Sequence, residues 1–86
     1  MTIAHAQTNL DAFYGRLVVE LRRLFREDPE YSYAASQTTP DVLAMKMTLG
    51  LDNGSASKDG KAVSATCKHF GIPHSYKAIR QFLSEV

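Results

Sequence analysis

The sequence has one cysteine, no tryptophan and no apolar run near the roughly 20 residues that a bilayer-spanning helix needs. Because Cys67 is alone, an intramolecular disulfide is excluded, and a small core without disulfides is typical of a reducing compartment. Residues 1–10 contain no basic stretch followed by an apolar run, so we expect no signal peptide. Together these absences predict a cytoplasmic protein with no membrane partner.

An excess of one charge is also lacking, since 10 Lys and Arg residues face 9 Asp and Glu residues, for a net charge of +1. The overall charge therefore indicates neither a nucleic acid nor a membrane surface as partner. The distribution is less even. Residues 1–57 hold five basic and seven acidic residues, whereas residues 58–86 hold five basic and two acidic residues, a net charge of +3.

The chain has 86 residues, and 44% of them are hydrophobic. That size and composition predict a single globular domain over residues 1–86 with one small core. A Rossmann enzyme, a TIM barrel and any two-domain architecture are excluded by length alone.

Apolar residues near the N-terminus recur with the spacing of one helix face: Leu10, Phe13, Tyr14, Leu17, Val18, Leu21, Leu24 and Phe25. Thr8 followed by Asp11 is a capping arrangement at the start of this helix. Pro29 predicts that the helix ends at about Asp28. The following segment, residues 30–39, has no periodicity, and we expect an ordered loop there.

A second helix is predicted over residues 42–51. Thr39-Pro40-Asp41 combines a capping threonine, a proline at the first helical position and an early acidic residue. The alternation of Leu43, Met45, Met47, Leu49 and Leu51 also fits a strand, but most of these residues are good helix formers. Because this helix is apolar on more than one side, it is either central in the core or part of a second interface.

Two further helices are predicted, over residues 59–70 and 75–85. Gly71 followed by Ile72 is typical of a helix end at which glycine takes the left-handed conformation, and Pro73 prevents continuation. The last helix has one apolar face, formed by Tyr76, Ile79, Phe82, Leu83 and Val86. The predicted fold is all-α, a compact single-domain bundle of about four helices.

Residues 62–83 read as a helix, the turn Phe70-Gly71-Ile72-Pro73-His74, and a second helix. This segment resembles a helix-turn-helix, with the small residue Cys67 four positions before the turn glycine. The resemblance implies a second helix that enters the major groove of DNA. The sequence departs from the pattern in the second helix, where Lys77 takes a position that is usually apolar.

The resemblance makes polar residues in and around the last two helices candidates for binding double-stranded DNA: Lys61, Lys68, His74, Ser75, Lys77, Arg80 and Gln81. Residues near the start of the last helix are expected to reach bases more easily than Gln81. Arg22, Arg23 and Arg26 form a second basic cluster. They fit either phosphate contacts or, as we favour, a solvated helix end that interacts with the helix dipole.

The alternative function is a protein-interaction module without nucleic-acid binding, by analogy with small inhibitors and adaptors of phages and plasmids. Ala12, Gly15 and Val19 form a strip of small and apolar residues opposite the main face of the first helix. This strip could pack on a second copy of the chain, and homodimerisation stays open.

Enzyme activity and cofactor binding are not expected. The spacing of Cys67, His69 and His74 matches no common zinc pattern, and Cys67 is predicted to face inward with a raised pKa and low reactivity. The sequence contains neither a pair of carboxylates on one face in a predicted pocket nor a glycine-rich phosphate loop. We therefore predict no metal and no catalytic residue.

Overall fold

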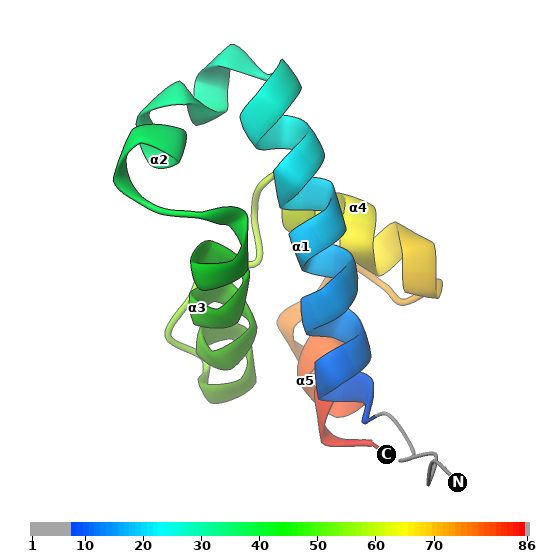
Figure 1. The fold of residues 1–86 in the computed structure, drawn as a ribbon. Coiled ribbons are helices and arrows are strands. Elements are labelled where there is room, and N and C mark those ends of the chain that lie inside the picture. Colours follow the sequence, from blue (N-terminus) through cyan, green and yellow to red (C-terminus); the bar gives the residue numbers. More distant parts are fainter. Residues whose placement is uncertain (1–7, 86) are drawn as a thin grey trace, which may run out of the picture.

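The computed structural model describes residues 8–85, all of whose regular elements are helical (Figure 1). In chain order they are α1 (Asn9–Glu27), the 3-10 helix η1 (Pro29–Tyr31), α2 (Ser32–Gln37), α3 (Pro40–Asn53), α4 (Lys61–Phe70) and α5 (Tyr76–Ser84). The all-α prediction is confirmed for this part of the chain. Residues 1–7 lie outside the described residues, and most of the segment used for the signal-peptide prediction lies there. Val86, predicted on the apolar face of the last helix, also lies outside them.

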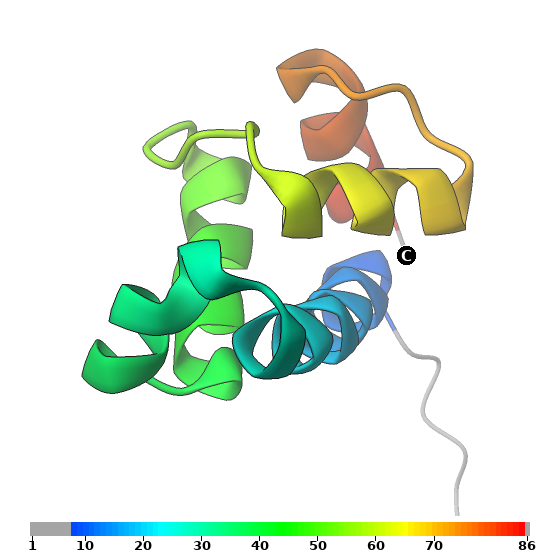
Figure 2. The same cartoon turned by 90° about the horizontal axis from the view of Figure 1, so that it is seen from above.

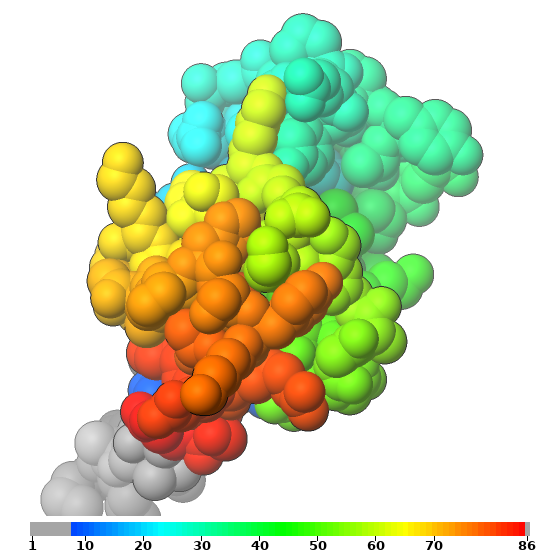
Figure 3. All heavy atoms as spheres, turned by 180° about the vertical axis from the view of Figure 1, so that it is seen from behind, coloured from blue at the N-terminus to red at the C-terminus, as the bar shows by residue number. Residues whose placement is uncertain are grey.

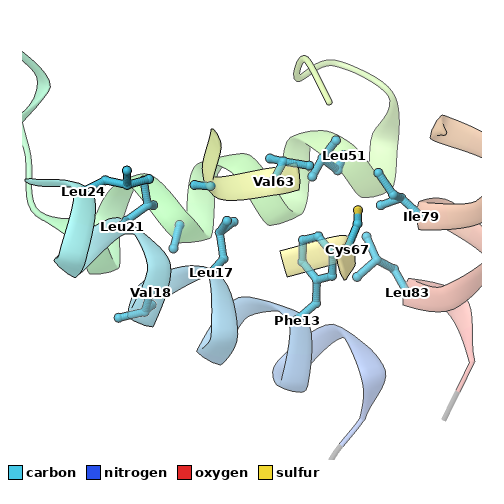
Figure 4. Packing of buried hydrophobic residues seen from close by; sticks show 12 residues of the cluster. Phe13, Leu17, Val18, Leu21, Leu24, Leu51, Val63, Cys67, Ile79 and Leu83 are labelled. Atoms are coloured by element: carbon cyan, nitrogen blue, oxygen red, sulfur yellow. The ribbon is translucent and has the colours of Figure 1, made fainter. Parts of the chain in front are cut away.

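Helix α1 is the element on which the others pack. Thr8 Oγ1 accepts a hydrogen bond from the Asp11 N–H at 3.1 Å, as the capping pattern predicts. Helices α3 and α4 lie on different sides of α1, and α5 packs against both α1 and α3 (Figure 2). The buried apolar side chains of α1 point into the space between these helices and form the core (Figure 4).

The prediction of a loop over residues 30–39 is wrong, because η1 and α2 occupy most of this segment. Asp28 Oδ1 accepts a hydrogen bond from the Glu30 N–H at 3.0 Å and thereby caps η1. Neither element contains a buried residue, so no apolar periodicity marks them in the sequence. The described chain therefore has five α-helices instead of the predicted four. Of the two tyrosines here, Tyr31 packs on Phe25 with ring centroids 6.1 Å apart, whereas Tyr33 is exposed.

The prediction that residues 42–51 form a helix and not a strand is confirmed, because they belong to α3. This helix begins at Pro40 and continues to Asn53. Thr39 Oγ1 caps it by accepting from the Val42 N–H at 3.3 Å. It ends at Gly54, whose φ of 80° is the left-handed conformation that favours glycine. Its inner side buries Ala44, Thr48 and Leu51.

Helix α4 begins at Lys61, two residues later than predicted, because Gly60 has a φ of 123° and cannot be helical. Its end follows the prediction, since Gly71 has a φ of 68° and the Ile72 N–H donates to the Cys67 carbonyl at 3.0 Å. None of the helices within residues 8–85 has the length and apolar character needed to cross a membrane.

Candidate functional site

Helices α4 and α5 both pack on α1, and an aromatic contact connects the end of α4 to α5. Phe70, at the end of α4, lies with its ring centroid 5.0 Å from that of Phe82 in α5. Both rings also pack near Phe13 of α1, at 6.3 and 6.4 Å. The two helices are steeply inclined to one another (Figures 1 and 2). Burial of Ile79 and Leu83 on the inner side of α5 leaves its opposite side to solvent.

The loop between α3 and α4 is tied to α5 by hydrogen bonds. The Tyr76 hydroxyl accepts from the Lys58 N–H at 3.1 Å and donates to the Ala56 carbonyl at 3.2 Å. His74 Nε2 lies 2.6 Å from the Lys58 carbonyl oxygen, to which the imidazole N–H donates. Arg80 Nε donates to the Asp52 carbonyl at 3.3 Å. These contacts bring a loop far away in sequence onto the same face as α5.

Three predicted site residues have structural roles in this arrangement. Ser75 Oγ accepts from the Ala78 N–H at 3.2 Å and caps α5. His74 and Arg80 hold the preceding loop through the two contacts just described. By contrast, the side chains of Lys68, Lys77 and Gln81 are exposed and make no hydrogen bond within residues 8–85.

Lys61 lies apart from the other candidates because it belongs to an ion pair with the end of α1. Its Nζ donates to Asp28 Oδ2 and lies 3.3 Å from a Glu30 carboxylate oxygen. The hydrogen bond from Lys61 holds the pKa of Asp28 below its usual range, and the Glu30 N–H adds to this effect. The same bond to Asp28 raises the pKa of Lys61.

Ion pairing separates the basic residues of the molecule into two groups. The paired group, each with a carboxylate within 4.0 Å, consists of Arg16, Arg22, Arg23, Arg26, Lys58 and Lys61. Within residues 8–85, Lys46, Lys68, Lys77 and Arg80 have no such partner. Three of these four residues belong to α4 and α5, which form one face of the molecule together with the loop before α4 (Figure 3).

Lys58 belongs to this face and was not among the sequence candidates. Its Nζ lies 5.7 Å from the centre of the Tyr76 ring and 3.2 Å from an Asp59 carboxylate oxygen. Lys58 precedes Tyr76 by 18 residues. The whole of α4 lies between the two residues in the sequence, so no periodic pattern connects them and only the folded chain reveals the contact.

The arginines of α1 each have an acidic neighbour. Arg22 lies 3.5 Å from Asp41, Arg23 lies 3.3 Å from Glu20, and Arg26 in the last turn lies 3.1 Å from Glu27. They line an open hollow of about 380 Å³ on the outer side of α1. Their charge is therefore largely balanced by carboxylates, in keeping with a solvated helix end.

The histidines and the cysteine near the turn do not converge. Cys67 is buried, as predicted, and burial raises the pKa of its thiol. His69 is exposed and packs edge-on against Phe70, with ring centroids 4.8 Å apart. Within the described residues no three His, Cys, Asp or Glu side chains are grouped as metal ligands.

Comparison of the chain with protein-family models, curated proteins and solved structures finds no match. What the site does is therefore inferred from its own chemistry. An exposed helix face with ammonium and guanidinium groups is suited to binding phosphate oxygens on an extended partner.

Proposed function

We propose that the chain binds double-stranded DNA through α5 and the end of α4. The observation that carries the proposal is that Lys68, Lys77 and Arg80 have no carboxylate partner within residues 8–85, whereas the arginines of α1 do. A carboxylate beside a cation repels an approaching phosphate and so offsets part of the attraction of that cation. A free cation displaces counterions from DNA and so contributes to affinity.

The inclination of α4 and α5 supports the same proposal. A helix-turn-helix has two helices at a steep angle joined by a short turn that often contains glycine, and here Gly71 provides that turn. Packing against α1 and α3 buries one side of α5 and leaves the side with Lys77 and Gln81 open. In this orientation α5 can approach a major groove without losing core contacts.

Among the candidates, the internal hydrogen bonds suggest a division of roles. His74 and Ser75 are engaged with the Lys58 carbonyl and the start of α5, so they position the helix. Lys77 and Gln81 are left to reach base edges, and Lys68 and Arg80 to contact phosphates. This division revises the expectation that His74 and Ser75 read bases.

The test compares two double variants that remove the same charge from different places. Lys68→Ala with Lys77→Ala removes two unpaired cations from the proposed site. Arg22→Ala with Arg26→Ala removes two paired cations from α1. Binding to a random pool of duplex DNA is followed by fluorescence anisotropy between about 50 and 200 mM salt. We expect the site variant to lower the slope of log K against log salt by about one unit through the lost phosphate contact of Lys68, and to weaken binding further through the loss of Lys77 at the base edges.

The control variant should retain the slope of the parent, and circular dichroism verifies that both variants are folded. Absence of binding by the parent at the lowest salt concentration would end the DNA proposal. An equal decrease in slope for both variants would show that net charge alone drives binding, which contradicts a site at α4 and α5.

Binding of another protein is the second candidate function, and one observation favours it. The outer side of α3 presents exposed apolar side chains that no other described element covers. If the DNA titration is negative, this side becomes the principal candidate surface.

A further inference from the structure

The outer side of α3 carries an apolar stripe that the core does not use. Val42, Met45 and Leu49 are spaced by three and four residues, so they share one side of the helix, and they are 48%, 40% and 48% exposed. The inner side of α3 already supplies the buried residues. The stripe is therefore available to a partner, and its composition is unusual for a helix surface that faces only water.

Helix α2, which precedes α3 in the chain, also has exposed apolar surface. Helix α2 contributes no buried residue, and its Tyr33 is 77% exposed. Within residues 8–85, four of the six large apolar side chains that are exposed lie on α2 and α3: Tyr33, Val42, Met45 and Leu49. Most of the large exposed apolar side chains of the described residues therefore belong to these two consecutive helices.

We propose that this stripe packs against the same stripe of a second copy of the chain, with the two α3 helices parallel. Val42 and Leu49 then occupy the first position of successive heptads, and Met45 occupies the fourth. Two-stranded pairing is favoured by a β-branched residue at the first position together with leucine at the fourth, and Val42 meets the first of these conditions. The proposal rests on α3 and is independent of DNA binding by α5.

Charge selects the parallel orientation. Asp41 lies on one flank of the stripe and Lys46 on the other, five residues later. In a parallel pair, flanking residues with this separation face each other across the two helices, so each Asp41 would meet the Lys46 of the other copy. In an antiparallel pair, equal flanks meet, and Asp41 would face Asp41 while Lys46 faces Lys46.

Both charged groups are exposed and can make this contact, although only Lys46 lacks a partner within the described residues. Lys46 is exposed and has no carboxylate within ion-pair distance in residues 8–85. Asp41 is exposed, and its only ion pair is with Arg22 at 3.5 Å, which engages one of its two oxygens. The second carboxylate oxygen can accept from the ammonium of the other copy.

The small area of the stripe limits the expected affinity of the dimer. Three half-exposed side chains bury far less than the roughly 800 Å² per partner of a standard interface, even with their flanking residues. We therefore expect a weak, concentration-dependent dimer with a dissociation constant on the order of 100 µM.

The first experiment is sedimentation equilibrium without DNA, at protein concentrations from about 10 µM to 1 mM. Met45→Glu places a charge at the centre of the stripe and should raise the dissociation constant at least about 100-fold. Val19→Glu, on the exposed outer side of α1, is the matched control and should leave association unchanged. It also tests the strip of Ala12, Gly15 and Val19 as a rival interface.

The second experiment reverses the flanking charges. Lys46→Asp should weaken association about tenfold, because two attractive pairs become repulsive. Asp41→Lys combined with Lys46→Asp should restore it, since the pairs are re-formed with opposite polarity. Circular dichroism at low concentration verifies that each variant is folded.

Three outcomes would overturn the proposal. A parent that is monomeric at about 1 mM removes the dimer and leaves the stripe to another partner. Dissociation by Val19→Glu with no effect of Met45→Glu moves the interface to α1. Failure of the double charge reversal to restore association contradicts the parallel orientation.

Discussion

Thr48 and Thr66 are both completely buried, and they differ in what their hydroxyl groups contact. Thr66 Oγ1 donates to the Ala62 carbonyl at 2.8 Å, one helical turn earlier. Thr48 Oγ1 has no hydrogen-bond partner among the described residues. We expect Thr48→Val to leave stability unchanged or to raise it by up to about 1 kcal/mol, because it removes an unsatisfied buried hydroxyl at constant shape. Urea denaturation of the parent and the variant measures the difference.

Thr66→Val is the matched control for that substitution. It removes a satisfied hydroxyl from an equally buried position and should lower the free energy of unfolding by about 0.5–1.5 kcal/mol. Equal losses for the two variants would mean that Thr48 has a partner in solution.

For single residues, the spacing of apolar positions in the sequence predicts most of the buried side chains correctly, among them Phe13, Leu17 and Ile79. It misses the buried polar ones, because polar residues are assigned to the surface by default. Thr66 can be buried because its own helix satisfies its hydroxyl. Glu20 can be buried because two arginines cover it, with Arg16 at 2.7 Å and Arg23 at 3.3 Å. The two arginines are spaced from Glu20 by four and three residues, a pattern that the sequence shows, but apolar spacing takes no account of it.

Two glycines inside helices give a test of how the elements pack. A Cβ at Gly50 of α3 would lie 2.4 Å from the Cβ of Ala56, whereas a Cβ at Gly15 of α1 would have no atom of another segment within 4 Å. Gly50→Ala should therefore destabilise by about 1–3 kcal/mol through overpacking. Gly15→Ala should stabilise by about 0.5–1 kcal/mol, because alanine is the better helix former. Thermal unfolding of the parent and of both variants measures the two changes in stability. A neutral Gly50→Ala would show that the loop after α3 is not packed on it.

The elements differ in how well the sequence predicts them, and burial explains the difference. Helices α1, α4 and α5 each bury one side and therefore show apolar periodicity. Helix α2 buries nothing and shows none. Helix α3 buries one side and exposes apolar residues on the other, which produces the alternation that resembles a strand. In the candidate site, the polar side of α5 follows from periodicity, whereas the contact of Lys58 with Tyr76 depends on the tertiary fold.

At the scale of the whole molecule, Lys61 and Asp28 join the start of α4 to the end of α1 across 33 residues. The lowered pKa of Asp28 means that this contact contributes stability above the ordinary aspartate pKa near 4, and that this stability is lost as pH falls through the folded-state value. The raised pKa of Lys61 acts at the other end of the scale, where its contribution is lost in strong alkali. Asp28→Asn should therefore be less stable than the parent at pH 6 and approach it below about pH 3.

Asparagine at position 28 retains an oxygen for the Glu30 N–H, so the substitution tests the charge and not the cap. Urea midpoints for the parent and the variant between about pH 2.5 and 7 provide the measurement. A difference that stays constant with pH would contradict the ionic origin of the contact.

The chain passes from α1 to α3 through η1 and α2, two elements without a buried residue. This connection is therefore the natural place to cut, lengthen or label the protein. A protease should nick it before it attacks the main helices, and a short insertion there should leave the core as it is. A dye attached at the exposed position of Tyr33 would displace no buried residue of α2 and would report changes in this connection while the core stays as it is.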